Sequence, residues 1–128
     1  MAGYYGHEYE VAVYAYFKVA IAKTDNKDEI DEAAFDATCR LYEHDTDIEV
    51  LDNNLIGIEQ NQKHFTVANV GLELKVKLTA YTTDEAYSKA ESMARDVELP
   101  AGVAFFECEA IDAERGENAI DWDLAVGE

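Results

Sequence analysis

The chain has 128 residues, of which 28 are acidic and 10 are basic, giving a formal charge of −18 at neutral pH. A surface with this charge repels nucleic acid and anionic membranes, so we expect the protein to bind neither directly. With 48% hydrophobic residues, the chain is long enough to bury one core, and no linker-like tract divides it. We therefore expect a single domain over residues 1–128, with an acidic tail over 114–128.

The cysteines and the N-terminus indicate a reducing compartment. Cys39 and Cys108 are far apart in the sequence and lack the spacing of metal ligands, which favours reduced thiols over a disulfide or zinc site. The N-terminal residues lack a basic segment followed by an apolar core, and the first apolar run contains Lys18 and Lys23. We expect a cytoplasmic protein, located in the host cell if a phage encodes it.

The first half of the chain predicts a strand followed by a helix. Apolar residues alternate strictly over residues 10–23, which is typical of a strand. Residues 24–44 predict a helix, because Asn26 and Glu29 match a capping box and apolar residues recur at helical spacing. The side of this helix opposite the apolar residues carries an acidic stripe, made of Glu29, Glu32, Asp36 and Glu43.

The stretch EHDTDIEVLDNN, residues 43–54, predicts a second strand in which every second residue is acidic. Side chains of a strand alternate between faces, so these carboxylates are expected in one row, about 6.6 Å apart. Residues 55–59 either continue this strand or begin another. The row consists of Glu43, Asp45, Asp47 and Glu49.

The second half repeats the alternation of strand and helix. Residues 64–81 predict a strand, residues 82–100 a helix capped by Thr82 with Glu85, and residues 102–113 a last strand. The order β, α, β, β, α, β predicts a ferredoxin-like α+β fold, with an antiparallel sheet and both helices on one face. The aromatic residues on the back of the first strand, Tyr14 and Tyr16, predict that the open face is covered. The cover is expected to be the tail with Trp122 or a second copy in a homodimer.

The excess negative charge is concentrated in two segments. Residues 25–59 contain 12 acidic and two basic residues, and residues 107–128 contain eight acidic residues and one basic residue. Adaptation to high salt would spread the charge over the whole surface, so the concentration favours a surface directed at one basic partner. Glu107 and Glu109 repeat the alternate spacing, although cross-strand pairing with Lys75 and Lys77 is an equally supported interpretation.

The sequence contains no complete catalytic or metal-binding motif. Residues 45–56 begin like a calcium-binding loop, but Val50 replaces the required glycine and Ile56 the final glutamate. Histidines occur without ligand spacing, at His7, His44 and His64. We therefore expect a protein without enzymatic activity, metal or cofactor.

In its length, its charge and its stretches EHDTDIEVLDNN and ECEAIDAERGENAIDWD, the chain resembles small acidic inhibitors of phages and mobile elements, such as anti-CRISPR and anti-restriction DNA mimics. The resemblance implies a stoichiometric inhibitor that fills the basic nucleic-acid groove of a CRISPR effector or restriction enzyme. The residues expected to replace phosphates are Glu43, Asp45, Asp47, Glu49, Glu29, Glu32 and Asp36, with Glu117, Asp121 and Asp123 as a second patch. Two alternatives are an immunity protein against a basic nuclease and a structural or small-molecule-binding ferredoxin-like module from a salt-adapted organism.

Overall fold

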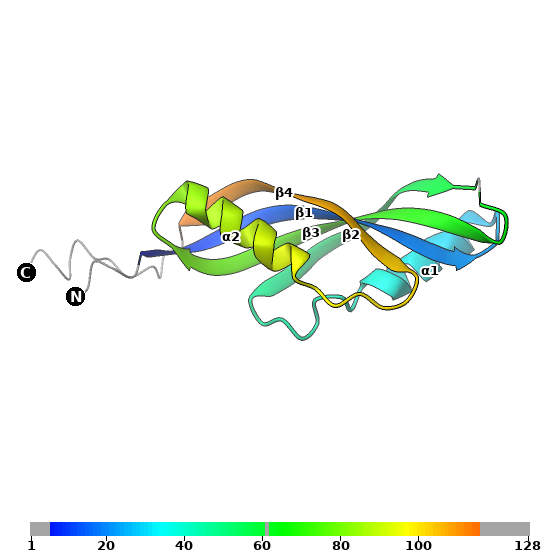
Figure 1. Ribbon diagram of the computed structural model, residues 1–128, viewed down its shortest axis with the longest axis horizontal. Coiled ribbons are helices and arrows are strands. Elements are labelled where there is room, and N and C mark those ends of the chain that lie inside the picture. The colour runs from blue at the N-terminus through cyan, green and yellow to red at the C-terminus, as the bar shows by residue number, and fades with distance from the viewer. Residues whose placement is uncertain (1–5, 61, 116–128) are drawn as a thin grey trace, which may run out of the picture.

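The protein forms an α+β structure in which a four-stranded antiparallel sheet carries two helices (Figure 1). The computed structural model describes residues 6–60 and 62–115. Along the chain the elements are β1 (His7–Ala22), α1 (Lys27–Thr38), β2 (Ile48–Glu59), β3 (Phe65–Ala80), α2 (Thr83–Arg95) and β4 (Val103–Arg115). The strands lie in the order β2-β3-β1-β4, so β2 and β4 form the edges of the described sheet. This architecture is compatible with the predicted ferredoxin-like class.

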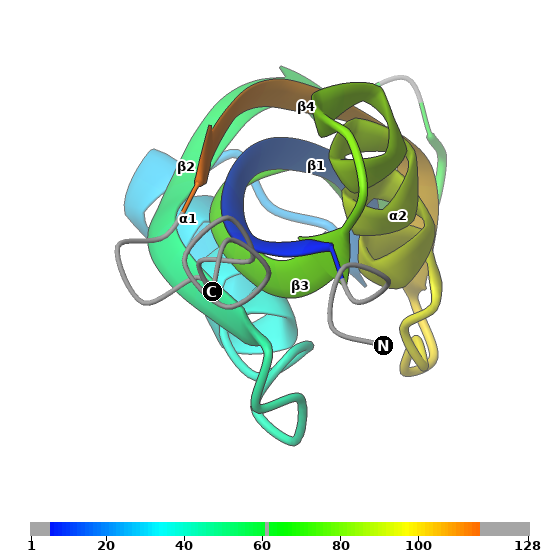
Figure 2. The ribbon, with the colours of Figure 1, turned by 90° about the vertical axis from the view of Figure 1, so that its left-hand side faces the viewer.

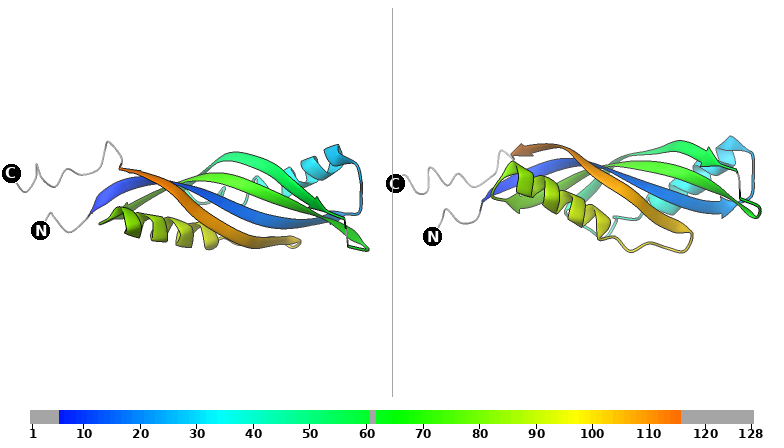
Figure 3. Two further views of the ribbon diagram at one scale, coloured as in Figure 1. Left: turned by 90° about the horizontal axis from the view of Figure 1, so that it is seen from above. Right: turned by 45° about the horizontal axis from the view of Figure 1, so that its top comes forward.

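The two central strands give the molecule an elongated, twisted shape. Strands β1 and β3 have 16 residues each and pair along their whole length. Strands twist in a right-handed sense, and the twist accumulates along strands as long as these. Helix α2 lies toward one end of the sheet and α1 toward the other (Figure 3). The view along the long axis shows the strands coiling, with the two helices at different positions around them (Figure 2).

The core lies between the helices and one face of the sheet. In β1 the odd positions 11–19 are buried, and they pair in register with the buried even positions 68–76 of β3. Strict alternation in the sequence thus corresponds to one apolar face, as predicted. Alanines on α2 keep its side chains short, which lets the helix lie close to the sheet. The helix side chains in the same core cluster are Ile30, Ala34, Ala86, Ala90 and Ala94, so both helices cover this face.

Both helices begin at the predicted N-caps. The side-chain oxygen of Asn26 accepts hydrogen bonds from the backbone N–H groups of Asp28 (3.0 Å) and Glu29 (3.3 Å). The Thr82 hydroxyl oxygen accepts one from the N–H of Glu85 (3.1 Å). Each predicted capping box is half formed, because the glutamate carboxylates accept from other donors, the Thr24 hydroxyl and the Tyr81 N–H.

Replacing Asn26 with alanine is expected to lower the free energy of unfolding by about 1 kcal/mol, because two N–H groups of the first turn lose their acceptor. Urea denaturation followed by circular dichroism measures this loss. Asn26→Ser is the matched control, since a serine hydroxyl can accept the same bonds. An equal loss in both variants would contradict a capping role.

The first helix ends at Thr38, so the prediction that it reaches residue 44 is wrong. The chain turns after Thr38 because Tyr42 is drawn into the core. Its ring is buried and meets the Phe17 ring edge to face, with centroids 6.4 Å apart. Its hydroxyl donates a hydrogen bond to the backbone carbonyl of Ala94 in α2, at 2.7 Å. The loop thereby ties the C-terminal ends of both helices together.

Candidate binding surface on the open sheet face

Strand β4 carries a line of carboxylates on the sheet face opposite the helices. Four exposed acids face this side, where they stand opposite alternate residues of β1. Alternate residues of a strand lie about 6.6 Å apart, so the line presents negative charge at regular intervals. We call these four residues the β4 row: Glu107 opposite Tyr16, Glu109 opposite Tyr14, Asp112 opposite Ala12, and Glu114 opposite Glu10.

A β-bulge brings the four carboxylates onto one face. In simple alternation, residues 107 and 109 would share a face with 111 and 113. The pairing of β4 with β1 instead shifts at Ile111, which has no partner in the register, so that Asp112 follows Glu109 on the open face. The sequence pattern indicated Glu107 and Glu109, whereas Asp112 and Glu114 join them on this face only through the bulge.

Within the described residues, no acid of the β4 row forms an ion pair. Lys75 pairs with Glu10 at 3.1 Å, and Lys18 pairs with Glu59 at 3.0 Å. The alternative that Glu107 and Glu109 pair with lysines of β3 does not occur, because β1 lies between β3 and β4. Strands two apart are separated by about 9 to 10 Å, so side chains of β3 and β4 do not stand directly opposite one another.

The ion pairs of this face shift the pKa values of Lys75 and Glu59. The hydrogen bond to Glu10 raises the pKa of Lys75 above its usual value, and the carboxylates of Glu49 and Glu114 act in the same direction. The hydrogen bond from Lys18 lowers the pKa of Glu59, with Asn69 adding to the effect. Lys75 therefore also acts on Glu114 at one end of the β4 row, whereas neither Lys75 nor Lys18 forms an ion pair with the other three acids of the row.

An apolar hollow of about 340 Å³ opens beside the β4 row. One of its lining residues is Tyr16, whose ring packs 3.4 Å from the position that a Cβ on Gly71 would occupy. Gly71 thus lets an aromatic side chain lie close to the backbone of the neighbouring strand. We call this site the Tyr16 hollow; its lining includes Tyr16, Lys18, Ile56, Asn69, Phe106 and Glu107.

The predicted acidic row in residues 43–54 is wrong as a strand feature. Strand β2 begins at Ile48, and the residues before it form turns. The Asp45 carboxylate accepts the backbone N–H of Asp47 at 3.0 Å, a local bond that stabilises a turn in place of a strand. Of the four predicted carboxylates, Glu49 lies in β2, whereas Glu43, Asp45 and Asp47 lie in the loop.

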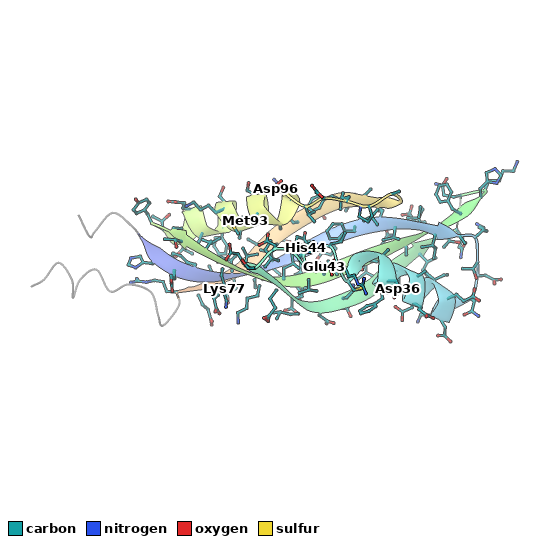
Figure 4. All side chains as sticks on the ribbon, turned by 90° about the horizontal axis from the view of Figure 1, so that it is seen from below. Asp36, Glu43, His44, Lys77, Met93 and Asp96 are labelled. Carbon is teal, nitrogen blue, oxygen red and sulfur yellow. The ribbon has the colours of Figure 1, made fainter. Side chains whose placement is uncertain are left out.

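The predicted helix acids lie in another layer of the molecule. Glu29, Glu32 and Asp36 are exposed on α1, which covers the sheet face opposite the β4 row. Figure 4 labels Asp36, with Glu43 and His44 from the following loop, and the three lie on the same side of the molecule. The predicted tail acids Glu117, Asp121 and Asp123, and Trp122, lie outside the described residues.

The described residues were also compared with the requirements of a metal site, a disulfide and a membrane span. No group of acidic, histidine or cysteine side chains in residues 6–60 and 62–115 is placed to hold a metal ion. Cys39 and Cys108 are free thiols, and burial raises the pKa of Cys108. None of the helices in this part of the chain is long and apolar enough to cross a membrane.

Comparison with protein-family models, with curated proteins and with solved structures finds no match for this chain. The open sheet face combines regularly spaced carboxylates with an apolar hollow.

Proposed function

We propose that the protein is a non-enzymatic inhibitor that presents its open sheet face to a basic nucleic-acid-binding protein. The observation that carries the proposal is the β4 row, in which four carboxylates share one face without forming an ion pair in the described part of the chain. Nucleic acid presents phosphates at regular intervals, and its protein partners bind them with lysine and arginine. Evenly spaced carboxylates on an exposed edge strand suit the same basic groove.

We assign the fold to the ferredoxin-like βαββαβ type. Two observations support the assignment: the chain order of the elements, and the insertion of β3 between β2 and β1 in the sheet. In this arrangement the helices occupy one face, which leaves the other face free for a partner. The proposed partner is an effector such as a CRISPR complex or a restriction enzyme in the cytoplasm of a host cell.

Neutralising the β4 row is expected to weaken partner binding by about fourfold to a thousandfold, because each of the four exposed charge pairs contributes roughly 0.2 to 1 kcal/mol. The variant is Glu107→Gln, Glu109→Gln, Asp112→Asn and Glu114→Gln. Tagged protein captures partners from bacterial lysate at low salt, and duplex DNA is then added to elute those bound through a nucleic-acid groove. Binding constants are measured with the protein recovered in this way.

A matched control removes the same number of charges from the helix side, by Asp31→Asn, Glu32→Gln, Asp36→Asn and Glu43→Gln. These four side chains are all exposed. The control is expected to keep nearly full binding, and melting temperatures of both variants should stay unchanged or rise as self-repulsion falls. Loss of binding in the control alone would contradict the assignment of the partner to the open face. Failure to capture any DNA-displaceable protein, with stability that increases steeply in molar salt, would instead favour the salt-adapted module.

A further inference from the structure

Each edge strand of the sheet contains two β-bulges, and each bulge exposes a large apolar side chain. In β2 the register skips Leu51 and Ile56, and in β4 it skips Phe106 and Ile111. Their relative exposures are 50%, 58%, 61% and 47%, respectively. A residue at a bulge lacks a cross-strand partner, so its side chain can be aimed independently of the alternation.

Two of these bulge residues border the Tyr16 hollow from opposite edges of the sheet. Ile56 belongs to β2 and Phe106 to β4, yet both line the same cavity. The methyl carbon Cγ2 of Ile56 lies 3.7 Å from the Cβ position of Gly71, next to the Tyr16 ring. The bulges therefore help to build one apolar site across four strands.

A cation of the chain itself already occupies the edge of this site. The Lys18 ammonium nitrogen lies 5.4 Å from the centroid of the Phe106 ring, within the range of a cation–π interaction. Its charge is balanced by Glu59, at 3.0 Å. Glu107, which also lines the hollow, has no ion-pair partner among the described residues. The site thus combines aromatic faces with an unpaired carboxylate.

We propose that the Tyr16 hollow receives an arginine side chain of the basic partner, an inference that rests on the proposed function. A guanidinium group is planar, so it can stack on Tyr16 or Phe106 while it donates two hydrogen bonds to Glu107. The hollow has about 340 Å³, near the lower end of the usual range for ligand sites, which suits one long side chain. Lysine carries the same charge, but its ammonium group cannot stack on a ring or form the bidentate hydrogen bonds to a carboxylate.

Charge complementarity selects this occupant over a second copy of the chain. Two molecules with a formal charge of −18 would bring their β4 rows together if their open faces met. Like charges placed opposite one another oppose association, whereas a cationic partner is attracted to the same face. A homodimer through this face would therefore contradict the inference.

The test compares fluorescently labelled octa-arginine and octa-lysine, which have equal charge, in anisotropy titrations at low salt. Wild-type protein is expected to bind octa-arginine more tightly than octa-lysine. Phe106→Leu keeps every charge but removes one ring, so the preference for arginine should fall about two- to fivefold. Phe35→Leu, on α1, makes the same change at a side chain with 50% exposure and should leave the preference unchanged.

A second variant tests the site while Tyr16, Phe106 and Glu107 are kept. Lys18→Gln removes the resident cation, which frees the Phe106 ring and the Glu59 carboxylate, so affinity for octa-arginine should rise about twofold or more. Lower affinity in this variant would overturn the inference. The melting temperature of each variant is measured to show that the protein is folded in the titrations.

The remaining outcomes separate this inference from the proposed function. Equal binding of the two peptides, or a dimer in sedimentation experiments that Phe106→Leu dissociates, would overturn the arginine site. Either result is compatible with the proposed function, provided that the variant with the neutralised β4 row no longer binds the captured partner. If neutralising the β4 row leaves capture unchanged while arginine preference persists, the proposed function fails and the hollow remains a guanidinium site.

Discussion

Replacing Phe17 with alanine is expected to lower the free energy of unfolding by about 3 to 5 kcal/mol, as is usual for a buried aromatic side chain. Phe17 is 1% exposed and lies where three parts of the core meet. Its ring packs edge to face against Phe105 of β4, with centroids 5.4 Å apart, and against Tyr42 of the α1–β2 loop. Truncation removes the buried surface, leaves a cavity and breaks both aromatic contacts. Urea denaturation followed by circular dichroism measures the difference.

The control for this variant is Phe106→Ala, which makes the same substitution in the neighbouring edge strand. Phe106 is 61% exposed, so its replacement is expected to cost less than about 1 kcal/mol. A similar loss of stability in both variants would contradict the burial of Phe17 and the exposure of Phe106. The comparison therefore also tests the bulge in β4 that leaves Phe106 without a partner in the register.

The central strands and the helix starts could be predicted from the sequence because local patterns determine them. Alternation over residues 10–23 reports directly which side chains of β1 are buried. Asn26 and Thr82 cap their helices through bonds to residues two or three positions away. Such features depend on near neighbours, and tertiary packing strengthens them without changing their place in the chain.

The end of α1 and the acids of residues 43–54 could not be predicted in this way. Helical spacing and a row of alternating acids both extend past Thr38 in the sequence, yet the chain turns there. The deciding contact joins Tyr42 to Ala94, 52 positions away, and no local pattern records it. Burying the Tyr42 ring outweighs the local preferences of the polar residues around it.

The part of the β4 row beyond Ile111, namely Asp112 and Glu114, could not be predicted because a bulge changes which face each residue occupies. The sequence nevertheless contains a signal for the bulges. Each bulge falls at the second of two consecutive apolar residues. The first members pack against the core and the second members are exposed. In the two edge strands an apolar doublet therefore marks each bulge, whereas the Tyr16–Phe17 doublet of the central strand β1 pairs with β3 without a register shift. The doublets are Val50–Leu51, Leu55–Ile56, Phe105–Phe106 and Ala110–Ile111.

Tyr42→Phe is expected to lower the free energy of unfolding by about 1 to 2 kcal/mol at neutral pH, and this difference should disappear in alkali. The hydroxyl of Tyr42 donates to the carbonyl of Ala94, and its loss leaves that buried carbonyl without the bond. Phenylalanine keeps the ring and its contact with Phe17. Urea denaturation of both proteins as a function of pH provides the measurement.

The pH dependence follows from burial, which raises the pKa of Tyr42 well above its usual value of about 10, with Cys108 and Asp45 acting in the same direction. Above pH 10 the unfolded chain releases this proton while the folded protein keeps it. The unfolded state then binds fewer protons, so wild-type stability falls by up to about 1.4 kcal/mol per pH unit from this residue. The variant lacks the titrating group, and the two stability curves should cross about one pH unit above 10. Parallel curves across this range would mean that Tyr42 ionises equally in both states and that its hydroxyl is not held in the core.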